Sequence, residues 1–292
     1  MNMTGTSALE TPSGKVASNE NFPVGSWLLP ARLRPHVAVF YRFARAIDDI
    51  ADNPDIASGD KIIRLNAFEA ALTAPSDDPR LDTARCMRQS LAVTGITDRY
   101  CRDLIAAFRQ DAVKNRYKGW QELMDYCRLS AAPVGRYLLD LHGGSADGYG
   151  PSDALCNALQ VLNHLQDCQE DYRLLNRVYL PEDWMMAEGL EIDDIKRDSS
   201  TDPMRSVLDR CLDGTDALLN TAKALPGGLV NWRLALESAV IIDIAENISV
   251  LLRRRDPLAG RVRLGLFGFF ACGLRGIWFG FAERRHLARG RR

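Results

Sequence analysis

Two short acidic motifs contain side chains that could hold hard metal ions. The first is Asp48-Asp49-Ile50-Ala51-Asp52, and the second is Asp167-Cys168-Gln169-Glu170-Asp171. Carboxylates four residues apart lie one turn apart on the same face of a helix, where their like charges repel and a cation is favourable. Mg²⁺ takes oxygen ligands of this kind, together with waters and phosphate oxygens. The pair therefore indicates Mg²⁺ chemistry on a diphosphate, in which the ions neutralise the leaving group.

Two solvated acidic helix faces are the simpler alternative, and the residues before each motif argue against it. The first motif follows an apolar and aromatic run made of Val39, Phe40, Tyr41 and Phe43. The second follows a similar run made of Leu159, Val161, Leu162 and Leu165. Acidic groups at the ends of core-like stripes are typical of a polar site at the mouth of an apolar cavity.

The elements that must position these motifs read as helices throughout, because no run alternates as a strand would. A helix over 34–53 is expected to end at Asn53-Pro54. We expect further helices over 60–73, 79–93, 98–113, 119–128, 131–142, 151–174, 203–224, 228–255 and 262–285. The sequence thus predicts an all-α fold with one catalytic domain at 19–285. A disordered polar leader at 1–18 and a basic tail at 286–292 would flank it.

Composition and charge narrow the class of protein. The net charge of −1 gives no reason to expect a nucleic-acid partner, and seven scattered cysteines without C-x-x-C spacing indicate reduced thiols in a cytoplasmic protein. The apolar stretch 264–282 contains Arg275, so we expect a buried or interfacial helix and not a membrane span. From Leu251 onward there are eleven arginines against two acidic residues. This basic segment suits peripheral contact with an anionic membrane, or equally a solvated tail.

The residues around both motifs resemble the squalene/phytoene synthase family. The likeness covers about residues 19–285 and is carried by E-N-F-P-V-G-S-W-L-L-P (20–30), R-P-H-V-A-V-F-Y-R-F-A-R-A-I-D-D-I-A-D (34–52), N-H-L-Q-D-C-Q-E-D-Y (163–172) and N-R-V-Y-L-P (176–181). Within the family, the finer likeness is to the bacterial hydroxysqualene synthases of hopanoid biosynthesis. It rests on E-N-F-P-V-G-S, F-A-R-A-I-D-D-I-A-D-N and S-A-A-P-V-G (130–135).

The resemblance implies an isoprenoid-synthase helical bundle with a central active-site cavity. It implies two or three Mg²⁺ ions, bound with the diphosphate by Asp48, Asp49, Asp52, Asn163, Asp167, Glu170 and Asp171. Family positions that contact the diphosphate are matched by Tyr41, Arg45, Asn163 and Gln166. Tyr126, in D-Y-C-R (125–128), matches the tyrosine that the family places beside the reacting carbons, and it joins Asp48, Asp52, Asp167 and Asp171 as a catalytic candidate.

Two departures from the family pattern lie close to where the fate of a carbocation would be decided. Gln166 stands where family members often have arginine, which weakens or replaces one diphosphate contact. The segment after Tyr126 reads L-S-A-A-P-V-G, where squalene synthases carry a V-A-G run.

The resemblance therefore implies a lyase that ionises presqualene diphosphate, rearranges the carbocation and captures it with water, giving hydroxysqualene and diphosphate. NADPH is not expected, and no G-x-G-x-x-G motif occurs, although squalene synthases bind NADPH without one. Handover of intermediates with other hopanoid-pathway enzymes would follow. One alternative is head-to-head prenyl transfer to presqualene diphosphate, squalene or phytoene. The other is a non-catalytic helical assembly factor with the same fold.

Overall fold

The computed structural model describes residue 9 and residues 29–265, and every structural statement below concerns these residues. Its α-helices are α1 (Arg34–Asp52), α2 (Ser58–Thr73), α3 (Asp82–Thr94), α4 (Arg99–Asp111), α5 (Trp120–Ser130), α6 (Ala132–Leu141), α7 (Tyr149–Leu175), α8 (Glu182–Ala187), α9 (Asp202–Ala222), α10 (Leu225–Gly228) and α11 (Trp232–Arg254). Short 3₁₀ turns η2 (Pro79–Leu81), η3 (Ala146–Gly148) and η4 (Ile192–Lys196) lie between them. The predicted all-α class is confirmed, since the described residues contain no strand.

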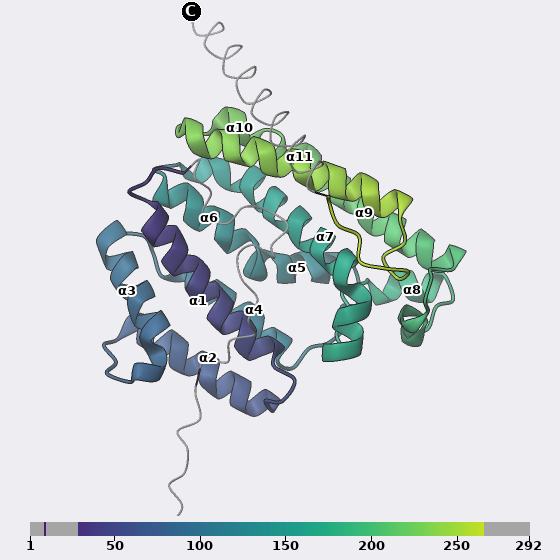
Figure 1. Ribbon diagram of the computed structural model, residues 1–292, viewed down its shortest axis with the longest axis horizontal. Coiled ribbons are helices and arrows are strands. Elements are labelled where there is room, and N and C mark those ends of the chain that lie inside the picture. Colours follow the sequence, from purple (N-terminus) through teal and green to yellow (C-terminus); the bar gives the residue numbers. More distant parts are fainter. Residues whose placement is uncertain (1–8, 10–28, 266–292) are drawn as a thin grey trace, which may run out of the picture.

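The helices form a bundle with the longest one, α7, in its middle. Figure 1 shows α5, α6 and α7 between α1–α4 on one side and α9–α11 on the other. Helix α7 packs against α5, α6, α9 and α11, while α4 joins α1 to α5 and α6. A helix of this length spans about 40 Å at 1.5 Å per residue. It therefore runs through most of the bundle and carries the second motif near its C-terminal end.

The two helices that carry the acidic motifs begin or end where the sequence requires. Pro35 lies in the first turn of α1, where its missing N–H costs nothing, and Asn53 leaves the helix in an extended conformation before Pro54. Helix α7 ends at Leu175 and is capped by Asn176, whose φ of 52° is left-handed. Its N–H donates to Tyr172 and the next N–H, that of Arg177, donates back to the Asp171 carbonyl. This turn directs the chain after α7 toward α1.

The expected helices agree with the structure within a few residues, apart from three places. The stretch 79–93 opens as a 3₁₀ turn, and 228–255 begins only at Trp232 because Pro226 to Gly228 fold into the separate short helix α10. Helix α8 was not expected. Residues 262–265 are not helical, and the rest of 262–285 lies outside the described residues, as do the leader 1–18 and the tail 286–292. Among the described residues, no helix has the length and apolarity needed to cross a membrane.

Helix α11 buries a carboxylic acid without a full set of partners. Glu237 is 5 % exposed, and its Oε2 atom has no hydrogen-bond partner within the described part of the chain. Burial raises the pKa of Glu237 to about 7. A raised carboxyl pKa means that the folded state keeps this proton up to a higher pH than the unfolded chain does. This side chain therefore lowers stability progressively as pH rises from the unfolded pKa near 4.5 to about 7.

Glu237→Gln is accordingly expected to raise the free energy of unfolding by about 2–3 kcal/mol at pH 8, and to change it little at pH 5. Urea unfolding at the two pH values measures this difference. Glu246→Gln on the same helix is the control, since the Glu246 side chain is 38% exposed and is paired with Lys223 at 2.7 Å. An equal gain for Glu237→Gln at both pH values would contradict a charge-based cause.

Candidate active site

The first acidic motif occupies the last two turns of α1. Arg45 lies one turn earlier and contacts both leading aspartates, with Nη1 at 2.7 Å from Asp48 Oδ2 and Nε at 3.3 Å from Asp49 Oδ1. Asp49 is buried, while Asp48, Asp52 and the upstream Tyr41 are half-buried. One guanidinium therefore offsets the repulsion between the two neighbouring carboxylates in this state.

The second acidic motif lies near the end of α7 and is contacted from a distant part of the sequence. Arg261 makes a two-point ion pair with Asp167, at 2.7 Å from Nε to Oδ1 and 2.8 Å from Nη2 to Oδ2. Asp171 is half-buried and Glu170 is exposed. Planar two-point pairing of this kind fixes the guanidinium as well as attracting it.

Gln166 positions the segment that brings Arg261 to α7. Its side chain is 3 % exposed, and its Nε2 atom donates to the Val262 carbonyl at 2.6 Å. The residue that was expected to contact diphosphate therefore binds the backbone next to Arg261. The guanidinium that contacts the second motif here is that of Arg261, which comes from the segment after α11.

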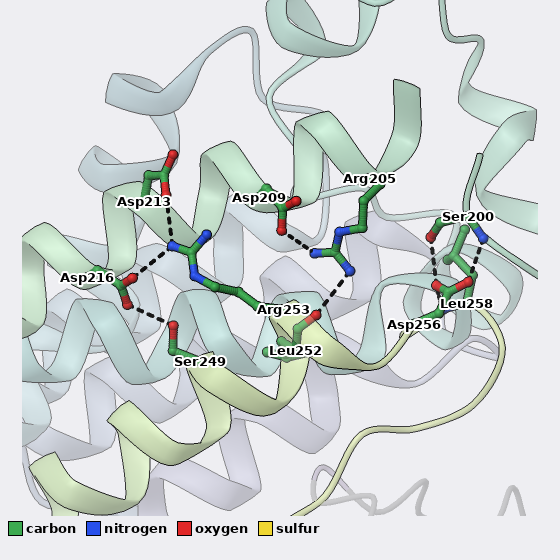
Figure 2. Close-up of polar contacts among 10 residues, drawn as sticks. All are labelled: Ser200, Arg205, Asp209, Asp213, Asp216, Ser249, Leu252, Arg253, Asp256 and Leu258. Atoms are coloured by element: carbon green, nitrogen blue, oxygen red, sulfur yellow. Dashed lines mark hydrogen bonds and ion pairs between the residues drawn. The ribbon is translucent and has the colours of Figure 1, made fainter. Parts of the chain in front are cut away.

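Contacts at the end of α11 determine where this segment starts (Figure 2). Arg253 donates to Asp213 at 2.8 Å and to Asp216 at 2.7 Å, which ties α11 to α9. Asp256 then accepts from the Ser200 N–H and hydroxyl, both at 2.6 Å. The chain after α11 is thereby held on a path across α7, and Arg261 follows five residues later.

Arg177 connects the two motifs directly. Its backbone N–H donates to the Asp171 carbonyl at 3.2 Å. Its guanidinium donates to Asp52 Oδ1 at 2.5 Å and to the Ala51 carbonyl at 2.8 Å. Arg177 is 5 % exposed, and buried Lys61 donates to the same Ala51 carbonyl at 2.7 Å. One arginine thus holds the end of α1 against the end of α7.

Beside Arg177 lies a buried cluster of tyrosines around one carboxylate. Tyr126 donates to Asp111 Oδ2 at 2.6 Å, and the Tyr179 hydroxyl lies 3.4 Å from Asp111 Oδ1. The Tyr179 ring stacks on His164 with centroids 3.5 Å apart, and the Tyr126 and Tyr179 centroids are 5.7 Å apart. These side chains come from α4, α5, α7 and the segment after α7, so they line one interior region shared by all four.

Burial sets the protonation of this cluster. It raises the pKa of Asp111 to about 7, although nearby Arg177 favours the charged form. It lowers the pKa of His164 to about 3, with a further contribution from Arg177, so this histidine is neutral. Burial likewise raises the pKa of Tyr126 well above its usual value. Near neutral pH, Asp111 is therefore the group of this cluster that can change its charge.

The structure joins the ends of the two helices that carry most of the expected site residues. Asp48, Asp49 and Asp52 lie at the end of α1, and Arg177 joins this end to the second motif. Asn163 precedes Asp167 by one turn of α7, and Tyr126 lies beside His164, the next residue along. Sequence reasoning assigned no role to the connecting residues Lys61, Asp111, Arg177 and Arg261. Only Arg177 carried a signal, as part of N-R-V-Y-L-P.

The donors around the two motifs fit a hard divalent cation chemically, since they are carboxylate and amide oxygens. Within the described residues, no three acidic, histidine or cysteine side chains already converge as a ligand set. Three arginines occupy the carboxylates instead: Arg45, Arg177 and Arg261. For a cation to bind these carboxylates, the side chains of Arg45 and Arg261 would have to move away from them. The ion pairs of these two arginines are partly exposed, so such a movement is possible.

Comparison with known proteins identifies the family. Residues 16–267 match the family model described as squalene/phytoene synthase. The chain belongs to the squalene/phytoene synthase family. It is 42% identical over 259 residues to the hydroxysqualene synthase of Rhodopseudomonas palustris, covering 89% of this chain and 88% of that one. It is 41% identical over 273 residues to the hydroxysqualene synthase of Sinorhizobium fredii, covering 94% and 92% respectively.

Two solved structures share the helical bundle. A squalene synthase from Alicyclobacillus acidocaldarius is 33% identical, with a TM-score of 0.70, covering 79% of this chain and 87% of that chain. A dehydrosqualene synthase solved with a ligand has a TM-score of 0.77 at 19% identity, covering 89% and 91%. The isoprenoid-synthase helical fold implied by the sequence is therefore confirmed.

Proposed function

We propose that this family member is a hydroxysqualene synthase, which ionises presqualene diphosphate and captures the rearranged carbocation with water. The observation that carries the proposal is the identity of 41–42% to hydroxysqualene synthases over most of both chains. Both acidic motifs and the tyrosine cluster lie in the matched region. The products are hydroxysqualene and diphosphate, so the reaction is a lyase reaction and not a prenyl transfer.

The side chains divide the work of this reaction between two regions. Asp48, Asp49, Asp52, Asn163, Asp167, Glu170 and Asp171 are the residues that would hold Mg²⁺. The metal, when bound, supplies positive charge that stabilises the leaving diphosphate. Arg45 and Arg261 lie at the two motifs and can turn from their aspartates to diphosphate oxygens, because guanidinium pairs with either anion. Gln166 holds the segment that carries Arg261, through its hydrogen bond to the Val262 carbonyl.

The tyrosine cluster supplies the apolar side of the site. Ring faces of Tyr126 and Tyr179 carry negative charge density, which stabilises a nearby carbocation and is strongest where water is excluded. Tyr41, on α1, faces the diphosphate end according to its family position. The neutral His164 stacked on Tyr179 adds no positive charge that would oppose the cation.

Head-to-head condensation is the second candidate, and one observation favours it: the relative at 33% identity from Alicyclobacillus acidocaldarius carries the name squalene synthase. Phytoene synthases are more distant, at 32% identity over 59% of the chain for that of Mycobacterium tuberculosis. A non-catalytic assembly factor is disfavoured because all five motif aspartates are present.

Product analysis of the purified chain with Mg²⁺ separates these functions. Presqualene diphosphate is expected to give hydroxysqualene at a rate that does not depend on NADPH, and farnesyl diphosphate alone is expected to give no product. Squalene formed only with NADPH, or turnover of farnesyl diphosphate, would move the chain to the condensing branch. No turnover of either substrate would favour the assembly factor.

Two further partners belong to the same proposal. The basic segment from Leu251 onward would contact an anionic membrane surface, where the apolar substrate and product partition. Handover to other hopanoid-pathway enzymes would take place at that surface. Sedimentation with anionic liposomes at low salt tests the contact, and protein left in the supernatant would refute it.

A further inference from the structure

Capture of a carbocation by water creates a proton that must be removed. Water adds through its oxygen, and the resulting oxonium becomes an alcohol only when it loses a proton to a base. The motif aspartates are committed to cations in the working enzyme. His164 is a weak base, since burial lowers its pKa to about 3. Two further carboxylates of the described interior are Asp111 and Glu237, and of these only Asp111 lies within the influence of Arg177 and Asp52, beside the motifs.

Asp111 is held in an arrangement suited to this task. It is 4 % exposed at the last position of α4, and both of its oxygens face tyrosine hydroxyls. Tyr126 donates its proton to Oδ2 at 2.6 Å, which leaves the lone pairs of the Tyr126 oxygen available to a second donor. A water molecule on the other side of Tyr126 could therefore pass a proton inward.

We propose that Asp111, acting through Tyr126, accepts the proton released when water captures the carbocation. The C–O bond to diphosphate breaks with its electron pair leaving on diphosphate, and the water oxygen forms the new C–O bond. The oxonium proton moves to the Tyr126 oxygen while the tyrosine's own proton moves to Asp111 Oδ2. Asp111 returns the proton by the same route once the product has left. This inference rests on the proposed function.

The charges that face Asp111 agree with a carboxylate that can take up a proton. Arg177 favours its charged form, whereas burial and Asp52 favour the neutral form. Lys61 on α2 faces the same interior, and the pKa of Lys61 is lowered by burial and by Arg177. Tyr117, Tyr126 and Tyr179 complete the surroundings. A general base accepts a proton most efficiently when its pKa lies close to the pH at which the enzyme works.

The chain contains a matched control for this arrangement. Asp140 also accepts from two tyrosines, with Tyr100 at 2.6 Å and Tyr149 at 2.7 Å. Tyr149 begins α7, whereas Asp167 lies eighteen residues further along the same helix, or about 27 Å at 1.5 Å per residue. Each cluster thus has one aspartate that accepts from two tyrosines, and the Asp140 cluster lies farther from the second motif.

Single-turnover reactions with presqualene diphosphate and Mg²⁺ test the proposal by measuring released diphosphate and hydroxysqualene separately. For Asp111→Asn we expect alcohol formation to fall about 100-fold. Diphosphate release should fall far less, and hydrocarbons formed by proton loss from carbon should replace the alcohol. Asp140→Asn should leave both quantities unchanged. Lowering the pH below about 7 should reduce the alcohol share of the wild type and not that of Asp111→Asn.

Tyr126→Phe keeps Asp111 and removes only the relay, so it provides a second test if Asp111→Asn does not fold. It should lower the alcohol share to the same extent, and the double variant should go no lower. An unchanged alcohol share in either folded single variant would overturn the role of Asp111 and leave the proposed function standing. A wild type that makes no alcohol from presqualene diphosphate would instead refute the proposed function itself.

Discussion

Replacing Arg177 with methionine should reduce turnover about 100-fold, because a misplacement of about 1 Å between cooperating groups is enough for such a loss. Arg177 touches both acidic motifs, through the Asp171 carbonyl on one side and through Asp52 and the Ala51 carbonyl on the other. Methionine fills a similar volume but makes none of the side-chain contacts. The carbonyl of Ala51 would keep Lys61, whereas Asp52 would lose its partner in the structure.

The same variant is expected to lower the free energy of unfolding by about 3 kcal/mol, since removing one partner of a buried ion pair leaves the other uncompensated. The half-exposure of Asp52 keeps the loss at the lower end of the usual range. Urea unfolding and steady-state turnover measure the two effects.

Arg116→Met is the matched control for Arg177→Met. Arg116 contacts the Asn176 carbonyl and donates to Asn176 Oδ1 at 2.7 Å, so it binds the neighbouring residue without reaching α1. We expect it to lose less than about 1 kcal/mol and little activity, as surface substitutions do. Addition of Mg²⁺ and inorganic diphosphate should raise the melting temperature of Arg116→Met but not that of Arg177→Met. Equal turnover in the two variants would show that Arg177 does not align the motifs.

The acidic motifs could be predicted from the sequence because their spacing and the helix that carries them are local properties. Four-residue spacing of aspartates on an amphipathic helix is visible within a single window of sequence. The connection between the motifs is not local. Arg177 lies beyond the end of α7, and its carboxylate partner Asp52 is 125 positions away, so no periodicity relates the two. Only its inclusion in a family motif marked it.

Position 166 shows how a correct observation at the sequence level can have a different physical meaning in the fold. The sequence has Gln166 where arginine is frequent, and the expected consequence is a diphosphate contact that is weakened or replaced. The structure places Gln166 against the Val262 carbonyl and brings Arg261 to Asp167. A guanidinium therefore contacts the second motif although position 166 does not supply it. Arg261 lies 95 positions after Gln166. Its contact with α7 depends on the path that the chain takes after α11, and no local sequence pattern predicts that path.

Asp111 was missed for a related reason. It ends a helix whose other face is apolar, and at the sequence level a polar residue at that position is typical of a solvated helix end. Its burial depends on α5 and on the segment after α7, which deliver Tyr126 and Tyr179 to it. Tyr126 could be predicted through its family position, but the carboxylate to which it donates could not.

Asp48→Asn and Asp167→Asn are each expected to lower the rate of diphosphate release by about 10²–10³-fold. Each variant loses one group that stabilises the charge on the leaving diphosphate, and losses of that size are typical for such groups. Single-turnover release of diphosphate from presqualene diphosphate at saturating Mg²⁺ measures this. In the proposed function the two motifs hold one substrate diphosphate between them, so we expect them to act as a unit. The double variant should therefore be little worse than the poorer single variant, since effects within one catalytic unit do not add.

Stabilisation by Mg²⁺ and inorganic diphosphate separates loss of binding from loss of chemistry. A ligand that is present at 100 times its dissociation constant raises the free energy of unfolding by about 2.7 kcal/mol. Each variant should lose most of that gain. Asp153→Asn is the control, because Asp153 also sits in an arginine pair, with Arg136 Nε at 2.8 Å, but lies on α7 fourteen residues before Asp167, or about 21 Å at 1.5 Å per residue. It should keep the full shift and full activity. If the double variant instead lost the product of the two single effects, the motifs would be acting independently, and a shared metal–diphosphate site would have to be abandoned.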